Sequence, residues 1–362
     1  MTTTHARYGP RERVPQRPMA GALPTPSVKF HVRASITAVL LGWILGLLVL
    51  SISHAGSTPA TSSPAVILAV GAPGEAEYAT NFLRQVELWS EAARRGGASL
   101  VTIGTDSTET TNDRPRLQQA LESASRDGDA ALWLVLIGHG TFDGKEARFN
   151  LRGPDVTATE LAAWLSPFHR PLAIIDTTSA SAPFLQKLSA TNRIVITATR
   201  SGYEQNATRF GKYFAEALLD PVADLDGDGQ VSLLEAFLSA SQAVAESYRN
   251  DGRLLTEHAL LDDTGDGLGT PAEWFSGLRA TKRPKDKAAL DSVRAHQLHL
   301  IPSAAEQQLP EETRARRDEL ERQVFTLREQ KAAMPAAEYY SQLEAILLKL
   351  ARLYAENPGD QR

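Results

Sequence analysis

The stretch best suited to a defined chemistry is "DLDGDGQVSLLE" at residues 224–235. Three of its acids alternate with other residues, and Gly229 stands where a calcium-binding loop turns sharply. Three carboxylates this close together repel one another unless a cation lies between them. An acidic, solvated turn that caps the following helix is the alternative. The predicted Ca²⁺ ligands are the carboxylates of Asp224, Asp226 and Asp228, the backbone carbonyl of Gln230, the hydroxyl of Ser232 (directly or through water) and a bidentate Glu235.

This pattern resembles the calcium loop of EF-hand proteins, and residues 262–273, "DDTGDGLGTPAE", form a weaker second copy. Thr270 and Glu273 are also spaced as a capping box with Pro271 at the first helical position, so a helix start without a metal is the alternative. A helix over about 231–250 would join the two loops, which could then clamp the connection to the preceding part of the chain. The ligands of the second site would be Asp262, Thr264, Asp266, Leu268, Thr270 and Glu273.

Two further stretches carry polar residues at the ends of apolar runs. "LVLIGHGTFDG" (134–144) places His139 and Gly140 after one run, and "IIDTTSASAPF" (174–184) places Asp176 after another. Many α/β hydrolytic enzymes carry a nucleophile at such a strand-to-loop edge. The chain has no cysteine, which excludes disulfides, thiolate metal sites and a Cys nucleophile. The hydroxyl candidates at this edge are Thr177, Thr178, Ser179 and Ser181.

Alternating strand-like and helix-like stretches surround these residues. Continuous apolar runs predict buried strands, and apolar residues at helical spacing predict helices between them. This order predicts an α/β fold with a doubly wound, mostly parallel sheet. Ligands of such sheets bind beyond the carboxyl ends of the strands, where His139 and Asp176 would lie. The expected strands cover 65–71, 99–104, 131–138, 171–176 and 193–199, and the expected helices cover 76–95, 114–126 and 157–165.

These stretches, with the later run "RIVITATRSGYEQN", resemble the caspase-like peptidases over residues 65–220, the clan that includes legumains and gingipains. The resemblance implies a caspase-like domain in which His139 is the general base and Gly140 supplies an oxyanion-hole amide. Thr178 stands where these peptidases have their nucleophilic Cys. A Thr hydroxyl is far less acidic than a thiol and needs a closely bonded base, so we expect a degenerate site. Asp176 is expected to orient the backbone of the loop.

The formal net charge of −5 and the pI near 6.0 argue against a nucleic-acid partner. Residues 36–52, "ITAVLLGWILGLLVLSI", carry no charge, and six basic residues but one acidic residue precede them. This pattern predicts a basic, disordered cytoplasmic tail over 1–34, a single transmembrane anchor over 35–53 and a linker over 54–64. The bulk of the chain would then lie outside the cytoplasm. A signal peptide cut after Ala55 is the alternative.

The last part of the chain changes character. Residues 221–280 are predicted to form a calcium-loop region, and residues 281–362 a coiled-coil-like helical hairpin that is broken at 334–335. Both helices carry apolar stripes that must be buried, either on the chain's own sheet domain or in a contact with a second copy or another partner. The stripes are Leu320, Val324 and Leu327 on one helix and Tyr339, Leu343, Ile346, Leu350 and Leu353 on the other.

The combined expectation is a membrane-anchored, calcium-binding caspase-like pseudopeptidase outside the cytoplasm. It would bind a peptide or protein partner or act as a scaffold, and we do not expect it to be an enzyme. Two alternatives stay open. One is an active peptidase that uses the hydroxyl of Thr178 or Ser179. The other is a structural calcium-binding envelope protein whose cleft is unused.

Overall fold

The computed structural model describes residues 63–106, 112–283, 285 and 289–356. The predicted basic tail and the predicted anchor over 35–53 lie outside the described residues. Among the helices that the structure describes, none is long and apolar enough to cross a membrane. The described residues belong to one compact unit, Ser57–Arg362.

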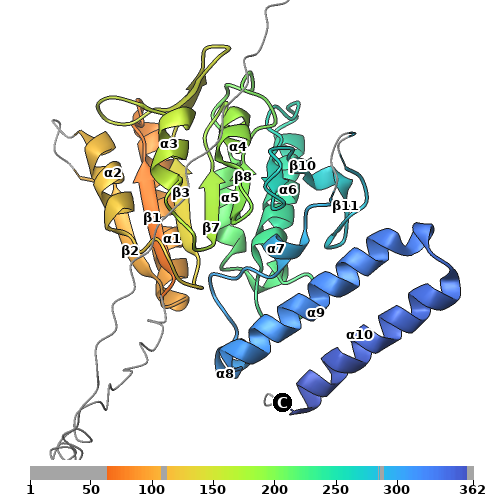
Figure 1. Cartoon of the computed structure of the whole chain (residues 1–362). Helices are drawn as coiled ribbons and strands as arrows, with labels where there is room; N and C mark the ends of the chain where they lie inside the picture. The colour runs from red at the N-terminus through yellow and green to blue at the C-terminus, as the bar shows by residue number, and fades with distance from the viewer. Residues whose placement is uncertain (1–62, 107–111, 284, 286–288, 357–362) are drawn as a thin grey trace, which may run out of the picture. The chain divides into compact units, whose positions relative to one another are not determined.

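A seven-stranded sheet forms the centre of this unit, in the order β10-β9-β8-β7-β3-β1-β2 (Figure 1). The five strands from β2 to β8 in this order run parallel, whereas β9 is antiparallel to β8 and β10 is antiparallel to β9. The predicted α/β fold with a mostly parallel sheet is therefore confirmed. The strands are β1 (Ala65–Val70), β2 (Ser99–Ile103), β3 (Leu132–Ile137), β7 (Leu172–Asp176), β8 (Arg193–Thr197), β9 (Leu260–Asp262) and β10 (Thr270–Pro271).

Helices cover both faces of the sheet, as the alternating order of strands and helices requires. One face packs against α1 (Ala76–Arg95), α5 (Phe210–Ala217) and α6 (Leu233–Asn250). The other face packs against α2 (Asp113–Ser123), α3 (Ala158–Leu165) and α4 (Ala182–Leu188). Because successive side chains of a strand point to opposite faces, each buried parallel strand contributes to both layers of the core.

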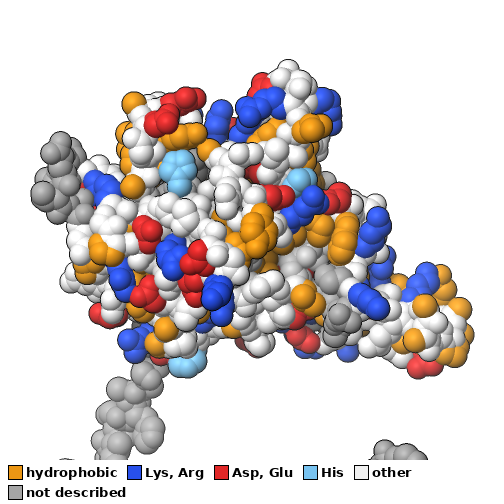
Figure 2. Space-filling view, turned by 90° about the horizontal axis from the view of Figure 1, so that it is seen from above, with side chains coloured by type: hydrophobic (Ala, Val, Ile, Leu, Met, Phe, Trp, Pro, Cys, Tyr) orange, Lys and Arg blue, Asp and Glu red, His pale blue; other side chains and the backbone are white. Residues whose placement is uncertain are grey.

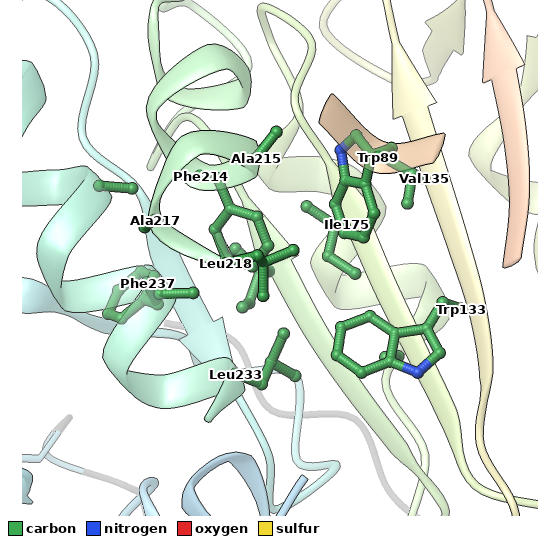
Figure 3. Packing of buried hydrophobic residues seen from close by; sticks show 14 of the residues in the cluster. Trp89, Trp133, Val135, Ile175, Phe214, Ala215, Ala217, Leu218, Leu233 and Phe237 are labelled. Atoms are coloured by element: carbon green, nitrogen blue, oxygen red, sulfur yellow. The ribbon is translucent and has the colours of Figure 1, made fainter. Parts of the chain in front are cut away.

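Aromatic side chains join α1, α5 and the sheet in the larger of the two core clusters (Figure 3). Trp89 of α1 stacks on Phe214 of α5 with 5.9 Å between ring centroids, and it meets Trp133 of β3 at 6.2 Å. All three are completely buried. Rings of this size bury roughly 150–250 Å² each, so this cluster fixes α1 and α5 on the sheet, and both helices border the candidate site.

Some elements were not expected from the sequence. A small antiparallel sheet of β4 (Gly140–Phe142), β5 (Ala147–Phe149) and β6 (Val156–Thr157) follows β3 directly. The predicted calcium-loop region, residues 221–280, also supplies β9 and β10 to the main sheet. These strands have two or three residues each, too few to show a two-residue periodicity in the sequence.

The C-terminal helices α9 (Glu311–Gln330) and α10 (Ala336–Glu356) lie side by side, joined by η3 (Lys331–Ala333) and the break at 334–335 (Figure 1). The stripe on α9 is buried, since Leu320, Val324 and Leu327 are at most 8% exposed. On α10 only Tyr339 is buried to this degree. The hairpin therefore packs within the chain mainly through α9.

Short elements complete the described chain. Residues 221–223 form η1 ahead of the first acidic loop, and the end of the second acidic loop leads into a 3₁₀ turn and a two-stranded ribbon. Two short helices precede α9. These elements are η1 (Pro221–Ala223), η2 (Ala272–Trp274), β11 (Phe275–Ser276), β12 (Arg279–Ala280), α7 (Val293–His296) and α8 (Ala304–Gln308).

Candidate functional site

The carboxyl ends of β3 and β7 bring the two predicted catalytic stretches together. The strands are parallel neighbours, with Leu136 of β3 in register with Asp176 of β7. Gly140 approaches the second stretch so closely that a Cβ atom there would lie 2.2 Å from the Ser179 carbonyl oxygen and 2.7 Å from Thr178 Oγ1. Glycine is therefore required at position 140 by this contact.

Thr178 is completely buried, and its hydroxyl is already engaged. Its Oγ1 donates to Asp176 Oδ1 at 2.7 Å, and its backbone N–H donates to the same oxygen at 3.0 Å. Asp176 thus orients the loop backbone, as expected from the sequence. A hydroxyl that points back to a buried carboxyl group has no access to a peptide in solvent.

The predicted oxyanion-hole amide is also engaged. Gly140 N–H donates to Ser179 Oγ at 3.2 Å, and Ser179 Oγ in turn donates to the Gly140 carbonyl oxygen at 3.1 Å. The next residue, Ala180, has a left-handed backbone with a φ of 53°. Such a conformation costs an alanine about 1–2 kcal/mol, and the bond from Ala180 N–H to the Glu204 carbonyl oxygen supports it.

Asp176 is the only buried acid in this loop, and burial raises its pKa from 3.8 to about 7 even though both bonds from Thr178 lower it. Its second oxygen, Oδ2, is buried and has no hydrogen-bond partner in the described part of the chain. A carboxyl group in such surroundings favours its neutral form.

His139 is half-buried and faces a different environment from Thr178. Its Nε2 lies 3.2 Å from the Pro73 carbonyl oxygen, which can only accept, so the neutral ring carries its proton on Nε2 and leaves Nδ1 as the acceptor. The ring also contacts Tyr78 and Phe82 edge-on, with centroids 4.7 and 5.3 Å away. These contacts fix its orientation at the wall of a cleft.

That cleft has a volume of about 370 Å³ and lies between α1, the loop after β3 and the start of α5. Thr177 lines it, but Thr178 does not. The structure thus places His139 and Gly138 at the cleft and the predicted nucleophile position below its surface. Other lining residues are Glu77, Tyr78, Asn81, Phe82, Gln85, Ala207, Thr208, Arg209, Lys212, Tyr213, Ser247 and Arg253.

Basic residues outnumber acidic ones among the residues that line the cleft, but two of the three have acidic partners: Arg209 pairs with Asp251 at 2.6 Å and Lys212 pairs with Glu216 at 3.9 Å. The start of α5 is held by the buried Glu257, whose carboxylate accepts from the backbone N–H groups of Arg209 and Phe210. Burial raises the pKa of Glu257. This cap stabilises the helix end that carries Lys212.

Sequence reasoning missed the cleft residues of α1, α5 and the end of α6. They are single polar or aromatic residues on separate helices, and the sequence gives no sign that these helices meet. Gln85 is a further example: it is 6% exposed, and its Oε1 has no hydrogen-bond partner among the described residues. On the whole upper face in Figure 2, acidic and basic side chains are interspersed.

The first acidic loop folds so that three predicted ligands converge. One oxygen from each of Asp224, Asp226 and Glu235 can be chosen so that all lie within 4.8 Å of one another. Asp224 accepts from the N–H groups of Gly227 and Gly229, at 2.8 and 2.9 Å. Partial burial and the negative charges of Asp228 and Glu235 raise the pKa of Asp226. This is the crowding that a cation would relieve.

The other predicted ligands of this loop have structural partners. Ser232 and Glu235 form a reciprocal capping box at the start of α6. Asp228 accepts from the backbone and side-chain amides of Gln230. The capping role therefore exists, and it coexists with the converging carboxylates.

The second acidic loop has the same turn as the first, but its last predicted ligands do not converge on the turn. Asp262 accepts from the N–H groups of Gly265 and Gly267, both at 2.8 Å, as Asp224 does in the first loop. Glu273, however, is exposed in η2, and Thr270 donates its hydroxyl to Asp291. The predicted capping box is wrong here, because Thr270 belongs to β10 and Pro271 is the N-cap residue. Binding through Thr264, Asp266 and Leu268 stays a prediction.

The first loop also contacts the segment at residues 296–303, which leads to the C-terminal helices. Leu233 N–H donates to the Leu298 carbonyl oxygen at 2.8 Å, and Ser303 N–H donates to Gln230 Oε1 at 3.0 Å. His296 Nε2 lies 3.6 Å from Asp226 Oδ2. These contacts join segments about 70 residues apart, so no local pattern predicts them.

No protein-family model matches the chain. No curated protein matches it either. Among solved structures, it is similar to protein GSU0716 from Geobacter sulfurreducens, with 11% identity and a TM-score of 0.36 over 50% of this chain and 89% of that one.

Two caspases are also among the similar structures. The Drosophila initiator caspase Dronc shows 13% identity and a TM-score of 0.39 over 58% of this chain and 81% of its own. Caspase-1 from Spodoptera frugiperda shows 11% identity and a TM-score of 0.38 over 56% of this chain and 87% of its own. These likenesses concern the fold, and the roles of His139, Gly140 and Thr178 stay predictions.

Proposed function

We propose that the chain is a calcium-binding, caspase-like pseudopeptidase that binds a peptide or protein through the cleft beside His139 and does not cleave it. One observation carries the proposal: Thr178 is completely buried and donates to Asp176, while His139 lines an open cleft. The site thus retains a binding surface without an accessible nucleophile.

The proposal predicts that the wild-type protein cleaves no member of a peptide library, with calcium present. Thr178→Cys should stay inactive, and its thiol should react at least about 100-fold more slowly with a thiol reagent in the folded than in the unfolded protein, because reactivity requires exposure. Thr141→Cys is the matched control, since Thr141 is exposed one residue after Gly140. The chain has no other cysteine, so each variant reports one thiol.

Cleavage by wild type that is lost in Thr178→Ala would instead establish a hydroxyl-dependent peptidase. Equal reactivity of the two introduced thiols would show that position 178 opens to solvent. Activity gained in Thr178→Cys would mean an intact catalytic geometry that lacks only its thiol. Each of these results contradicts a different part of the proposal.

We propose an acidic peptide as the ligand, on the basis of the three basic residues that line the cleft. Lys212→Glu should weaken the binding of an acidic peptide about tenfold, because it replaces an attraction by a repulsion worth about 1 kcal/mol or more at a partly solvated site. Lys187→Glu on α4, at the opposite face of the sheet, is the matched control and should leave affinity unchanged. Fluorescence anisotropy with labelled acidic and basic peptides measures both. Equal binding of the two peptides by wild type would contradict the assignment.

We further propose that Ca²⁺ at the first acidic loop has a structural role, supported by the converging carboxylates and by the contacts of this loop with residues 296–303. Membrane anchoring through residues 35–53 is part of the same proposal and rests on the sequence alone. Resistance of the full chain to alkaline extraction from membranes tests it. Release at alkaline pH would contradict it.

A further inference from the structure

The carboxyl group of Asp176 is buried and titratable, and its protonation state plays no part in the proposed function. Asp176 ends β7, a central strand of the main sheet, and it is completely buried. Its Oδ1 accepts both bonds from Thr178, and its Oδ2 has no hydrogen-bond partner in the described part of the chain. An ionised carboxylate here would lack both water and a second partner, so the surroundings favour the neutral form.

None of the neighbouring elements that the structure describes supplies a charge that would stabilise an ionised Asp176. Burial raises its pKa, and the bonds from Thr178 are the influences that lower it. The strands β3 and β4 carry no titratable side chain, whereas Lys187 lies in the last turn of α4 and Arg193 at the opposite end of β8. Acidic and imidazole groups of the adjoining loops have partners of their own. These are a backbone carbonyl for His139, Arg200 and His258 for Glu204, and backbone N–H groups at the start of α5 for Glu257.

We propose that the protonation state of Asp176 controls a local opening of residues 178–180: this segment stays closed while the carboxyl group is protonated and opens more readily once the group is ionised. An ionised carboxylate is stabilised by any motion that lets water reach it. Thr177, the next residue along the chain, already lines the cleft. Solvent therefore comes to within one residue of the buried group.

The contacts of the loop favour a motion of residues 178–180 alone. The residues on either side of this segment are held by bonds to β3 and to Thr199, which follows β8. Opening breaks the two bonds between Ser179 and Gly140 and the bond from Ala180 N–H to the Glu204 carbonyl oxygen. It also releases the left-handed backbone of Ala180, whose φ is 53°. The broken bonds keep the open form a minor one, and hydrogen exchange detects such minor forms.

Proton linkage sets the direction and the size of the effect. The pKa of Asp176 is about 7 in the closed form, and it returns towards its ordinary value of 3.8 once water reaches the carboxyl group. Between these two values the open form has released a proton that the closed form retains, so each unit by which the pH rises favours opening. The open population should therefore be about 50-fold larger at pH 7 than at pH 5, and it should change little above pH 8.

An opening next to Thr177 would change the shape of the cleft, and so it would regulate the binding of a peptide there. This consequence rests on the proposed function. The opening itself does not, and the experiment that tests it needs no peptide, so the two proposals can fail separately.

Hydrogen exchange of the full chain in detergent measures the opening, with a chelator present throughout. The probes are the backbone N–H groups of Thr178, Ser179 and Ala180, followed at pH 5, 6, 7 and 8 and corrected for the intrinsic exchange rate at each pH. Wild type should show the rise of about 50-fold between pH 5 and pH 7. Asp176→Asn is neutral at every pH and should show none. Asp129→Asn replaces an exposed acid and should behave as wild type.

Ionisation of Asp176 also favours global unfolding, so the central strand β3 is the reference. A local opening lets residues 178–180 exchange faster than β3, at a rate that low urea concentrations do not change, because little surface becomes exposed. Equal rates and equal urea dependence in both segments would show that the segment opens only when the whole unit unfolds. That result, a pH dependence that persists in Asp176→Asn, or the absence of a pH dependence in wild type would overturn the inference.

Discussion

Calcium should raise the midpoint of thermal unfolding of the metal-free protein by roughly 5 °C or more at 10 mM, and Asp228→Asn should remove most of this shift. With a dissociation constant of about 0.1 mM, in the range of extracellular calcium modules, 10 mM Ca²⁺ stabilises the folded state by about 2.7 kcal/mol. For a unit of this size, each kcal/mol moves the midpoint by about 2–4 °C. Differential scanning fluorimetry with and without a chelator measures the shift.

The second loop provides a matched control for this prediction. Asp228 and Asp266 are both exposed, both occupy the fifth position of their loops, and each accepts from the backbone N–H two residues later. An Asn at either position keeps an accepting oxygen, so the two substitutions have similar local costs. Asp266→Asn should therefore retain the calcium shift. Loss of the shift in Asp266→Asn alone would move the site to the second loop, and no shift in wild type would leave the first loop as an acidic turn.

The contacts of the first loop add a second readout. Because residues 298 and 303 are hydrogen-bonded to residues 233 and 230, calcium should slow amide hydrogen exchange in the segment before α9. The buried strand β3 should show no change. Equal slowing of hydrogen exchange in both segments would indicate that calcium stabilises the whole fold and does not act through the contacts of the loop with residues 298 and 303.

Replacing Asp176 by Asn should make the protein more stable at pH 8 while leaving its stability at pH 4 nearly unchanged. The pKa of Asp176 is about 7 in the folded state, against an ordinary value of 3.8. Between these values the unfolded chain has released a proton that the folded chain retains. Each unit by which the pH rises therefore lowers the free energy of unfolding by about 1.4 kcal/mol. Over the whole interval between the two pKa values the loss is on the order of 4 kcal/mol. The loss is complete once the pH exceeds the folded pKa.

The variant isolates this contribution because an Asn at position 176 is neutral at every pH and keeps an oxygen for both bonds from Thr178. Urea unfolding at pH 4, 6 and 8 in the presence of a chelator measures it. Asp129→Asn is the control, since Asp129 is exposed. Between pH 4 and pH 8 this variant should lose as much free energy of unfolding as wild type. If Asp176→Asn and wild type lost the same amount between pH 4 and pH 8, the carboxyl group would be ionised in the folded protein.

Long, strongly patterned elements were predictable from the sequence. The expected strand at 65–71 and the expected helix at 76–95 agree with β1 and α1, because a continuous apolar run and a helical stripe each extend over enough residues to be distinguished. The capping box at Thr157 and Glu160 was also predictable, since it depends on neighbours in the chain.

Features that depend on distant contacts were not predictable. The motif placed Thr178 at the edge of the sheet, but its burial under Gly140 and Ser179 follows from how two loops meet. The cleft depends on α1 and α5 lying side by side, which no local pattern encodes. Likewise, the stripe on α10 showed that the helix is amphipathic, but not that only one side of it would be covered.

The late position of β9 and β10 in the chain affects synthesis. During synthesis β8 emerges from the ribosome well before residues 260–271 do. Until those residues pair with it, the edge of β8 has unpaired backbone groups. An open edge of this kind is a template for pairing with other chains. A recombinant fragment that ends near residue 220 lacks β9 and β10, so the edge of β8 stays unpaired. We expect this fragment to aggregate under conditions in which a fragment that extends past residue 280 stays soluble.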